Sequence, residues 1–138
     1  MYRSILVAID GSPDATHALD QAIQIASKFD AELHALYVVD TRRATSAATK
    51  DSLHELGGQA IRPVKQRAAQ RNVSLTTTIT EGVPAEEILT YAEDYSIDLI
   101  VLGAKGKSGL ERFFFGTVAE RVTRHADTSV LLARRSRE

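Results

Sequence analysis

Cysteine is absent from this sequence of 138 residues, which excludes disulfide bridges and thiol chemistry. The absence fits the reducing cytosol, so we expect a cytoplasmic protein. Long apolar runs are absent as well, because none approaches the roughly 20 residues of a membrane-spanning helix. The first apolar run is entered by Ile5, which leaves no room for a signal peptide. We therefore expect no membrane insertion.

An excess of charge of either sign is also lacking. Seventeen lysines and arginines face eighteen aspartates and glutamates, for a formal net charge of −1. A nucleic-acid-binding domain normally carries a basic excess, so we expect no nucleic-acid partner. The basic residues at 134–137 are interpreted as a solvated tail. The length and the 43% hydrophobic content suit one globular domain over residues 1–138.

Short apolar runs alternate along the chain with amphipathic segments of helical length. Strands are expected at residues 4–9, 31–39, 74–80, 98–102 and 129–133. Helices are expected at residues 13–29, 51–71, 84–92 and 117–125. A polar loop is expected over 40–50, and Gly57, Gly58 and Pro63 weaken the middle of the second helix. The alternation predicts an α/β fold, with a parallel sheet covered by helices on both faces.

The order of the strands follows from the third one, in which apolar residues alternate with threonines. Such a strand has one wet face and belongs at an edge of the sheet. We predict a doubly wound, Rossmann-like sheet of five strands in the order 3-2-1-4-5. The chain then reverses between strands one and four, where doubly wound sheets bind ligands. Strand one leads into Asp10 and strand four into Gly103, so we expect the ligand between them.

A glycine-rich segment follows the fourth strand. It reads Gly103-Ala-Lys-Gly106, then nine residues, then Gly116-Thr117 at the start of the last helix. Glycine lets backbone N–H groups approach a ligand closely, and a helix N-terminus adds donors and a partial positive charge. The segment therefore predicts an anion site, with a nucleotide phosphate as the expected anion. Lys107 and Ser108 are expected to supply supplementary contacts.

Two better-known phosphate motifs do not match this segment. A Walker A loop needs a glycine five positions before Gly106, where this chain has Val101 within an apolar run. A dinucleotide fingerprint would have to follow the first strand, where the chain reads Asp10-Gly-Ser-Pro13 instead. Both motifs are excluded.

The remaining pattern, G-x2-G-x9-G-[ST], resembles the phosphate- and ribose-binding motif of the ATP-binding branch of the universal stress protein family. The resemblance extends over essentially the whole chain and includes residues 5–12, 82–88, 98–103 and 129–132. It implies ATP as the ligand, with Mg²⁺ or Mn²⁺ bound through the phosphates and no metal ligand of its own in the protein. It also implies a role in stress adaptation.

The family pattern implies a role for each matching residue. Asp10 would lie beside the adenosine and the phosphate-bound metal, and Val38 would line the adenine pocket. Leu102 and Gly103 would face the ribose and the adenine. The phosphates would be contacted by the backbone N–H groups of Gly106, Gly116, Thr117 and Val118. The Thr117 hydroxyl would add a further contact.

Several of these residues also have purely structural interpretations. Asp10 could turn the chain after a strand, and Thr117 with Glu120 matches a capping box. The three phenylalanines at 113–115 suit an apolar plug better than a stacking site. The histidines show no close pair of the kind that zinc sites use. We therefore interpret all four as structural, namely His17, His34, His54 and His125.

No pair of a nucleophile and a base stands out near the glycine-rich segment, and Ser12 is explained as a helix cap. We assign no catalytic residue and expect a nucleotide-dependent regulator with slow or no hydrolysis. A slow ATPase or phosphotransferase that uses the same pocket is the alternative.

The fifth strand, Ser129–Ala133, is apolar on both faces although the predicted order places it at an edge. An uncovered apolar edge invites pairing with another chain. We therefore expect a homodimer through this strand, besides an unidentified protein partner.

Overall fold

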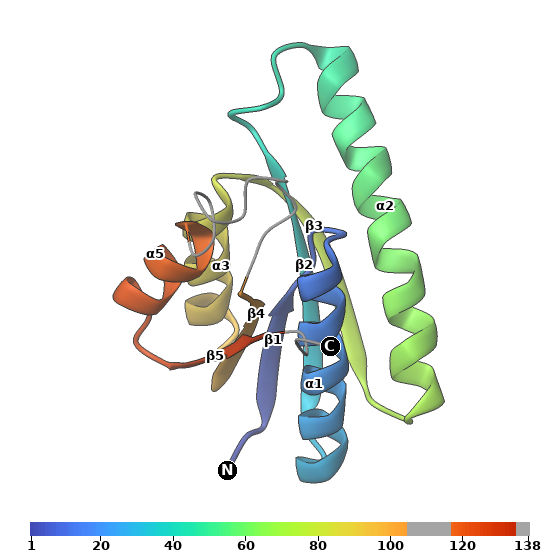
Figure 1. Ribbon diagram of the computed structural model, residues 1–138, viewed down its shortest axis with the longest axis vertical. Coiled ribbons are helices and arrows are strands. Elements are labelled where there is room, and N and C mark those ends of the chain that lie inside the picture. Colours follow the sequence, from blue (N-terminus) through green and yellow to red (C-terminus); the bar gives the residue numbers. More distant parts are fainter. Residues whose placement is uncertain (105–116, 135–138) are drawn as a thin grey trace.

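The computed structural model describes residues 1–104 and 117–134, and a five-stranded parallel sheet forms the middle layer (Figure 1). The strands are β1 (Ser4–Ala8), β2 (Glu32–Asp40), β3 (Leu75–Gly82), β4 (Leu99–Gly103) and β5 (Ser129–Ala133). Their order is β3-β2-β1-β4-β5, and every neighbouring pair is parallel. The predicted fold class and strand order are confirmed.

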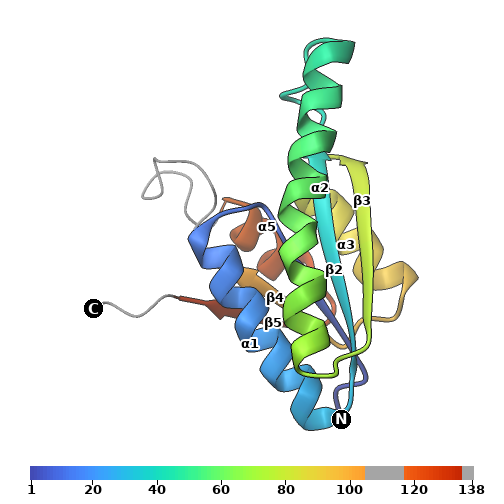
Figure 2. The same cartoon turned by 90° about the vertical axis from the view of Figure 1, so that its right-hand side faces the viewer.

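Helices cover both faces of the sheet (Figures 1 and 2). They are α1 (Pro13–Phe29), α2 (Ala47–Gln70), α3 (Pro84–Asp94) and α5 (Thr117–His125). Alternate residues of a strand point to opposite faces, so the sheet supplies two cores. Ile5 and Val7 pack toward α1 and α2, whereas Leu6 and Ile100 pack toward α3 and α5.

The start of α1 is set by local chemistry, as the sequence indicates. Ser12 caps the helix, and its Oγ accepts a hydrogen bond from the N–H of Ala15 at 3.1 Å. Pro13 occupies the first helical position, where its missing N–H costs nothing. Asp30 ends the helix in a left-handed conformation with a φ of 54°. The position of this N-terminus matters because it adjoins the switch point.

Helix α2 begins four residues earlier than expected, so the loop predicted over 40–50 is confirmed only for residues 41–46. Ser46 caps it by accepting a hydrogen bond from the N–H of Thr49 at 3.1 Å. The helix then continues without a break past Gly57, Gly58 and Pro63. A Cβ added at Gly57 would lie 2.7 Å from Cδ1 of the Tyr37 ring. Gly57 is therefore a point of close contact between helix and sheet, not a weak point.

The two edges of the sheet each expose an apolar side chain. On β3, Ile79 is 37% exposed among threonines, and on β5, Leu132 is 38% exposed. The interpretation of β3 as an edge strand is confirmed. Within residues 1–104 and 117–134, no helix combines the length and apolar character that crossing a membrane requires.

Candidate functional site

The turn between β1 and α1 forms the first part of the site. Asp10 follows β1, and its Oδ1 accepts a hydrogen bond from the N–H of Ser12 at 2.9 Å. Gly11 between them has a φ of 81°, which favours glycine. The turn-forming interpretation of Asp10 is thus observed. The other carboxylate oxygen of Asp10, Oδ2, accepts no hydrogen bond within the described part of the chain. The role of Asp10 toward a ligand stays a prediction.

Gly103 at the end of β4 forms the second part. A Cβ added there would lie 2.7 Å from the carbonyl carbon of Asp14 and 2.8 Å from the backbone nitrogen of Ala15. Both atoms belong to the first turn of α1. A residue with a side chain would push β4 and α1 apart. The structure therefore brings Gly103 against the N-terminus of α1, next to the Asp10 turn, as the switch-point argument predicts.

An apolar wall forms the third part. Leu102 is buried in the core between the sheet and helices α3 and α5. Val38 on β2 and Val118 on α5 are partly buried and pack against that same core. These three predicted site residues thus lie on one face of the sheet. Binding pockets for small molecules are lined mainly by such apolar side chains, with a few polar groups for orientation.

The start of α5 lies at Thr117, whose side chain is exposed. Ala119 and Val122 bury the inner face of the helix, and Arg121 reaches Glu86 on α3 at 3.5 Å. The prediction of a capping box is wrong. Glu120 instead pairs with Arg124 one turn onward at 3.2 Å, and no described hydrogen bond joins its carboxylate to Thr117. The Thr117 hydroxyl therefore has no capping role toward Glu120.

The other predicted phosphate contacts lie outside the described residues. These are Gly106, Lys107, Ser108 and Gly116, and the three phenylalanines at 113–115 share that segment. Their roles stay predictions.

Tyr37 is a neighbour of Asp10 that sequence reasoning missed. Burial raises the pKa of its phenol, the nearby Asp10 carboxylate raises it further, and Arg43 opposes both. The side chain comes from β2, and its ring lies against Gly57 of α2. No sequence motif marks Tyr37, because its proximity to Asp10 arises from the pairing of β1 with β2.

Asp40 and Arg42, at the end of β2, form a second pair that sequence reasoning missed. Asp40 Oδ1 accepts hydrogen bonds from the backbone N–H of Arg42 at 3.0 Å and from its Nε at 2.9 Å. The second carboxylate oxygen accepts one from the guanidinium at 2.8 Å. These bonds hold the pKa of Asp40 below its usual value. An aspartate two residues before an arginine at a strand end was the available signal.

Three of the four histidines make side-chain hydrogen bonds within the fold. Buried His34 contacts the Tyr91 hydroxyl at 2.7 Å through Nδ1 and Glu32 at 3.1 Å through Nε2. His54 contacts Glu81 at 2.6 Å, and His17 contacts Gln21 at 3.0 Å. In residues 1–104 and 117–134, no group of three or more acidic or histidine side chains could hold a metal ion.

Comparison with protein families matches residues 1–134 to the universal stress protein family. The chain belongs to this family. Universal stress protein MJ0531 of Methanocaldococcus jannaschii is 40% identical over 145 residues, which cover 100% of this chain and 85% of MJ0531. The resemblance that the sequence motifs indicate is thereby confirmed.

Two solved structures extend the likeness to three dimensions. Hypothetical protein MJ0577, the subject of a structure-based assignment of biochemical function, superposes with a TM-score of 0.90 at 29% identity, over 100% of this chain and 99% of its own. A universal stress protein in complex with cAMP superposes with a TM-score of 0.77 at 26% identity, over 98% and 99% of the two chains. A relative with this fold thus binds an adenine nucleotide.

Proposed function

We propose that this universal stress protein binds ATP at the carboxyl ends of β1 and β4, with Mg²⁺ or Mn²⁺ held through the phosphates. The observation that carries the proposal is the contact of Gly103 with the first turn of α1 beside Asp10. Only a residue without a Cβ permits that approach, and the N-terminus of α1 beside it favours anions. The relative in complex with cAMP supports an adenine nucleotide as the ligand.

The residues around this point fit such a ligand. The apolar wall of Val38, Leu102 and Val118 suits the flat face of adenine. The unshared carboxylate oxygen of Asp10 suits the ribose hydroxyls or the phosphate-bound metal. The glycine pattern at 103, 106 and 116 would supply backbone N–H groups to the phosphates, with Thr117, Lys107 and Ser108 beside them.

We further propose that the nucleotide is held and not turned over, so that the protein acts as a nucleotide-dependent regulator of stress adaptation in the cytoplasm. At the switch point, the Asp10 carboxylate already accepts a hydrogen bond from the turn that follows it, and the second carboxylate nearby, Asp14, is buried in the first turn of α1. A single-turnover assay of ATP cleavage, run with wild type and Asp10→Ala, tests this. Cleavage of the bound ATP by wild type that is lost in Asp10→Ala would favour the slow-ATPase or phosphotransferase alternative. In a separate steady-state assay, turnover of several ATP per second would contradict the proposal.

The binding proposal is tested by mass spectrometry of the small molecules released from gently purified protein. We expect an adenine nucleotide, with ATP as the main species. Gly116→Val places a branched side chain where the motif requires an approach of the backbone to phosphate, so it should abolish the nucleotide without unfolding the protein. A folded Gly116→Val variant that retains ATP would refute the assignment of the segment.

A further inference from the structure

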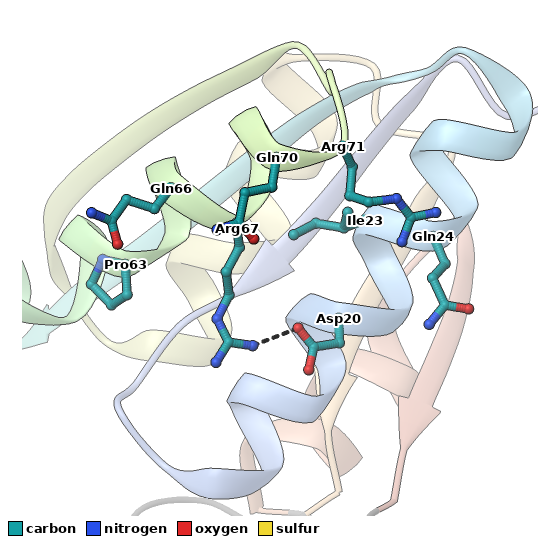
Figure 3. Close-up of a pocket in the computed structure, with 8 residues that line it drawn as sticks. All are labelled: Asp20, Ile23, Gln24, Pro63, Gln66, Arg67, Gln70 and Arg71. Atoms are coloured by element: carbon teal, nitrogen blue, oxygen red, sulfur yellow. Dashed lines mark hydrogen bonds and ion pairs between the residues drawn. The ribbon is translucent and has the colours of Figure 1, made fainter.

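A groove between α1 and α2 lies away from the switch point. It is open to the surface and has a volume of about 580 Å³ (Figure 3), within the ~300–1,000 Å³ range of small-ligand sites. Asp20, Ile23 and Gln24 of α1 form one side, and residues 63–71 of α2 form the other. Both helices begin at the carboxyl ends of the strands, so these later turns lie toward the opposite end of the sheet (Figure 1).

The groove has a small apolar floor, and the Arg67 side chain spans it from α2 to α1. The apolar floor consists of two lining residues, Ile23, which is only 3% exposed, and Pro63, which is exposed. Arg67 reaches from α2 to Asp20 on α1, and its guanidinium donates a hydrogen bond to Oδ1 at 2.6 Å (Figure 3). The charge of Asp20 is therefore matched by Arg67, and it does not neutralise any further cation in the groove.

Arg71 supplies that further cation. Arg71 lies at the C-terminal end of α2, where its backbone N–H donates a hydrogen bond to the carbonyl of Ala68 at 3.1 Å. Its side chain extends from the end of α2 toward α1 (Figure 3), and it makes no hydrogen bond or ion pair with any residue in 1–104 or 117–134. A free guanidinium above an apolar floor is suited to bind a carboxylate through two parallel hydrogen bonds.

The remaining polar groups are primary amides. Gln24 lies on α1, and Gln66 and Gln70 lie on α2. Each amide offers both a donor and an acceptor, which matches the N–H and C=O groups of a peptide backbone. The groove thus combines a site for a carboxylate, partners for a backbone and an apolar floor.

The charge of the surrounding helix surface favours the same kind of ligand. The stretch of α2 that lines the groove, residues 63–71, contains three basic residues and no acidic one, in a chain whose net charge is −1. Such a local positive field attracts acidic partners.

We propose that this groove binds an extended acidic segment of a partner protein. A carboxylate of that segment pairs with Arg71, its backbone contacts the glutamine amides, and an apolar side chain packs against Pro63 beside Ile23. The proposal does not depend on nucleotide binding at the switch point, because no residue of the groove belongs to that site.

Fluorescence anisotropy with a labelled peptide, Gly-Leu-Glu-Leu-Glu-Gly, tests the proposal on the full chain. We expect saturable binding to wild type and at least about a tenfold loss of affinity in Arg71→Glu. Arg62→Glu makes the same charge change on the same helix but outside the groove, so it should stay within about twofold of wild type. Asp20→Asn releases Arg67 and should tighten binding, an effect that misfolding cannot produce.

Three results would overturn the proposal. One is no saturable binding of the peptide at millimolar concentration. Another is an equal loss in Arg71→Glu and Arg62→Glu, which would mean attraction to net charge alone. The third is equal affinity for a peptide with both glutamates replaced by glutamine. Melting temperatures of the variants serve as the check on folding.

Discussion

At the scale of single residues, Gly103 determines how closely β4 approaches α1. Gly103→Ala would place a Cβ within 2.7 Å of the Asp14 carbonyl carbon, a backbone atom that cannot swing away. We expect the free energy of unfolding to fall by about 1–3 kcal/mol, as overpacking of a core typically costs. We also expect weaker ATP binding, because the two elements that flank the site must separate.

Chemical denaturation and calorimetric titration with MgATP measure these two effects on Gly103→Ala. A variant with the stability and the affinity of wild type would show that the contact does not shape the site.

Asp40 provides a prediction about pH at the same scale. Its pKa is lowered, chiefly by the hydrogen bonds from Arg42. A lowered pKa in the folded state means that the pair stabilises the fold above the ordinary aspartate pKa of about 4. That contribution is lost as pH falls through the lowered pKa of the folded state. The end of β2 should therefore loosen only in acid.

NMR titration of the Asp40 carboxyl carbon tests this assignment. In Arg42→Ala, the pKa of Asp40 should rise toward its ordinary value, because the guanidinium that favours the charged carboxylate is gone. Arg62→Ala, which changes the same charge on α2, should leave the pKa of Asp40 unchanged. An unchanged pKa in Arg42→Ala would contradict the pairing.

At the scale of elements, two adjacent glycines of α2 should respond in opposite ways to the same substitution. Gly57→Ala would drive a Cβ to within 2.7 Å of the buried Tyr37 ring, whereas a Cβ at Gly58 meets nothing within 4 Å. Thermal denaturation should show Gly57→Ala destabilised by about 1–3 kcal/mol. Gly58→Ala should be stabilised by about 0.5–1 kcal/mol, because alanine suits a helix interior better than glycine.

Equal effects at both positions would contradict the assigned contact between α2 and β2. Since Tyr37 also lies near Asp10, Gly57→Ala should in addition weaken nucleotide binding, whereas Gly58→Ala should not.

Most of the fold could be predicted from the sequence because it depends on local patterns. Apolar runs of strand length and the threonine alternation of β3 determine the elements and the edge, and the crossover rules then determine the order. The N-terminus of α2 could not be placed, because Ser46 lies in a polar stretch without apolar periodicity. Gly57 was misjudged for a different reason. Gly57 is needed because it lies against Tyr37 on β2. Helix propensity takes no account of such contacts between elements.

In the candidate site, too, some residues could be predicted from the sequence and others depend on contacts between elements. The meeting of Asp10 and Gly103 was predictable from topology, because β1 and β4 are neighbours with their carboxyl ends together. Tyr37 was not predictable, since its approach to Asp10 is known only once side chains are placed. Asp40 and Arg42 left a signal, an aspartate two residues before an arginine at a strand end, which was overlooked. The capping box of Thr117 failed because Glu120 has an alternative partner in Arg124.

At the scale of the whole molecule, the free edge of β5 is where we propose that a homodimer forms. Leu132 on β5 and Ile79 on β3 are almost equally exposed, at 38% and 37%, on opposite edges of the sheet. Leu132→Arg would bury a charge in the proposed interface, so light scattering should report a monomer. Ile79→Arg should leave the dimer intact. A dimer that survives Leu132→Arg, or a monomeric wild type, would exclude this edge.

The most direct test of the account is an amide NMR titration of the labelled protein with MgATP. It measures both whether the nucleotide binds and where. We predict saturable shifts centred on Asp10, Val38, Leu102, Gly103 and Val118, with little change at Asp20 or Arg71 in the groove between α1 and α2. No saturable shift at millimolar MgATP, or shifts centred on that groove, would contradict nucleotide binding at the switch point.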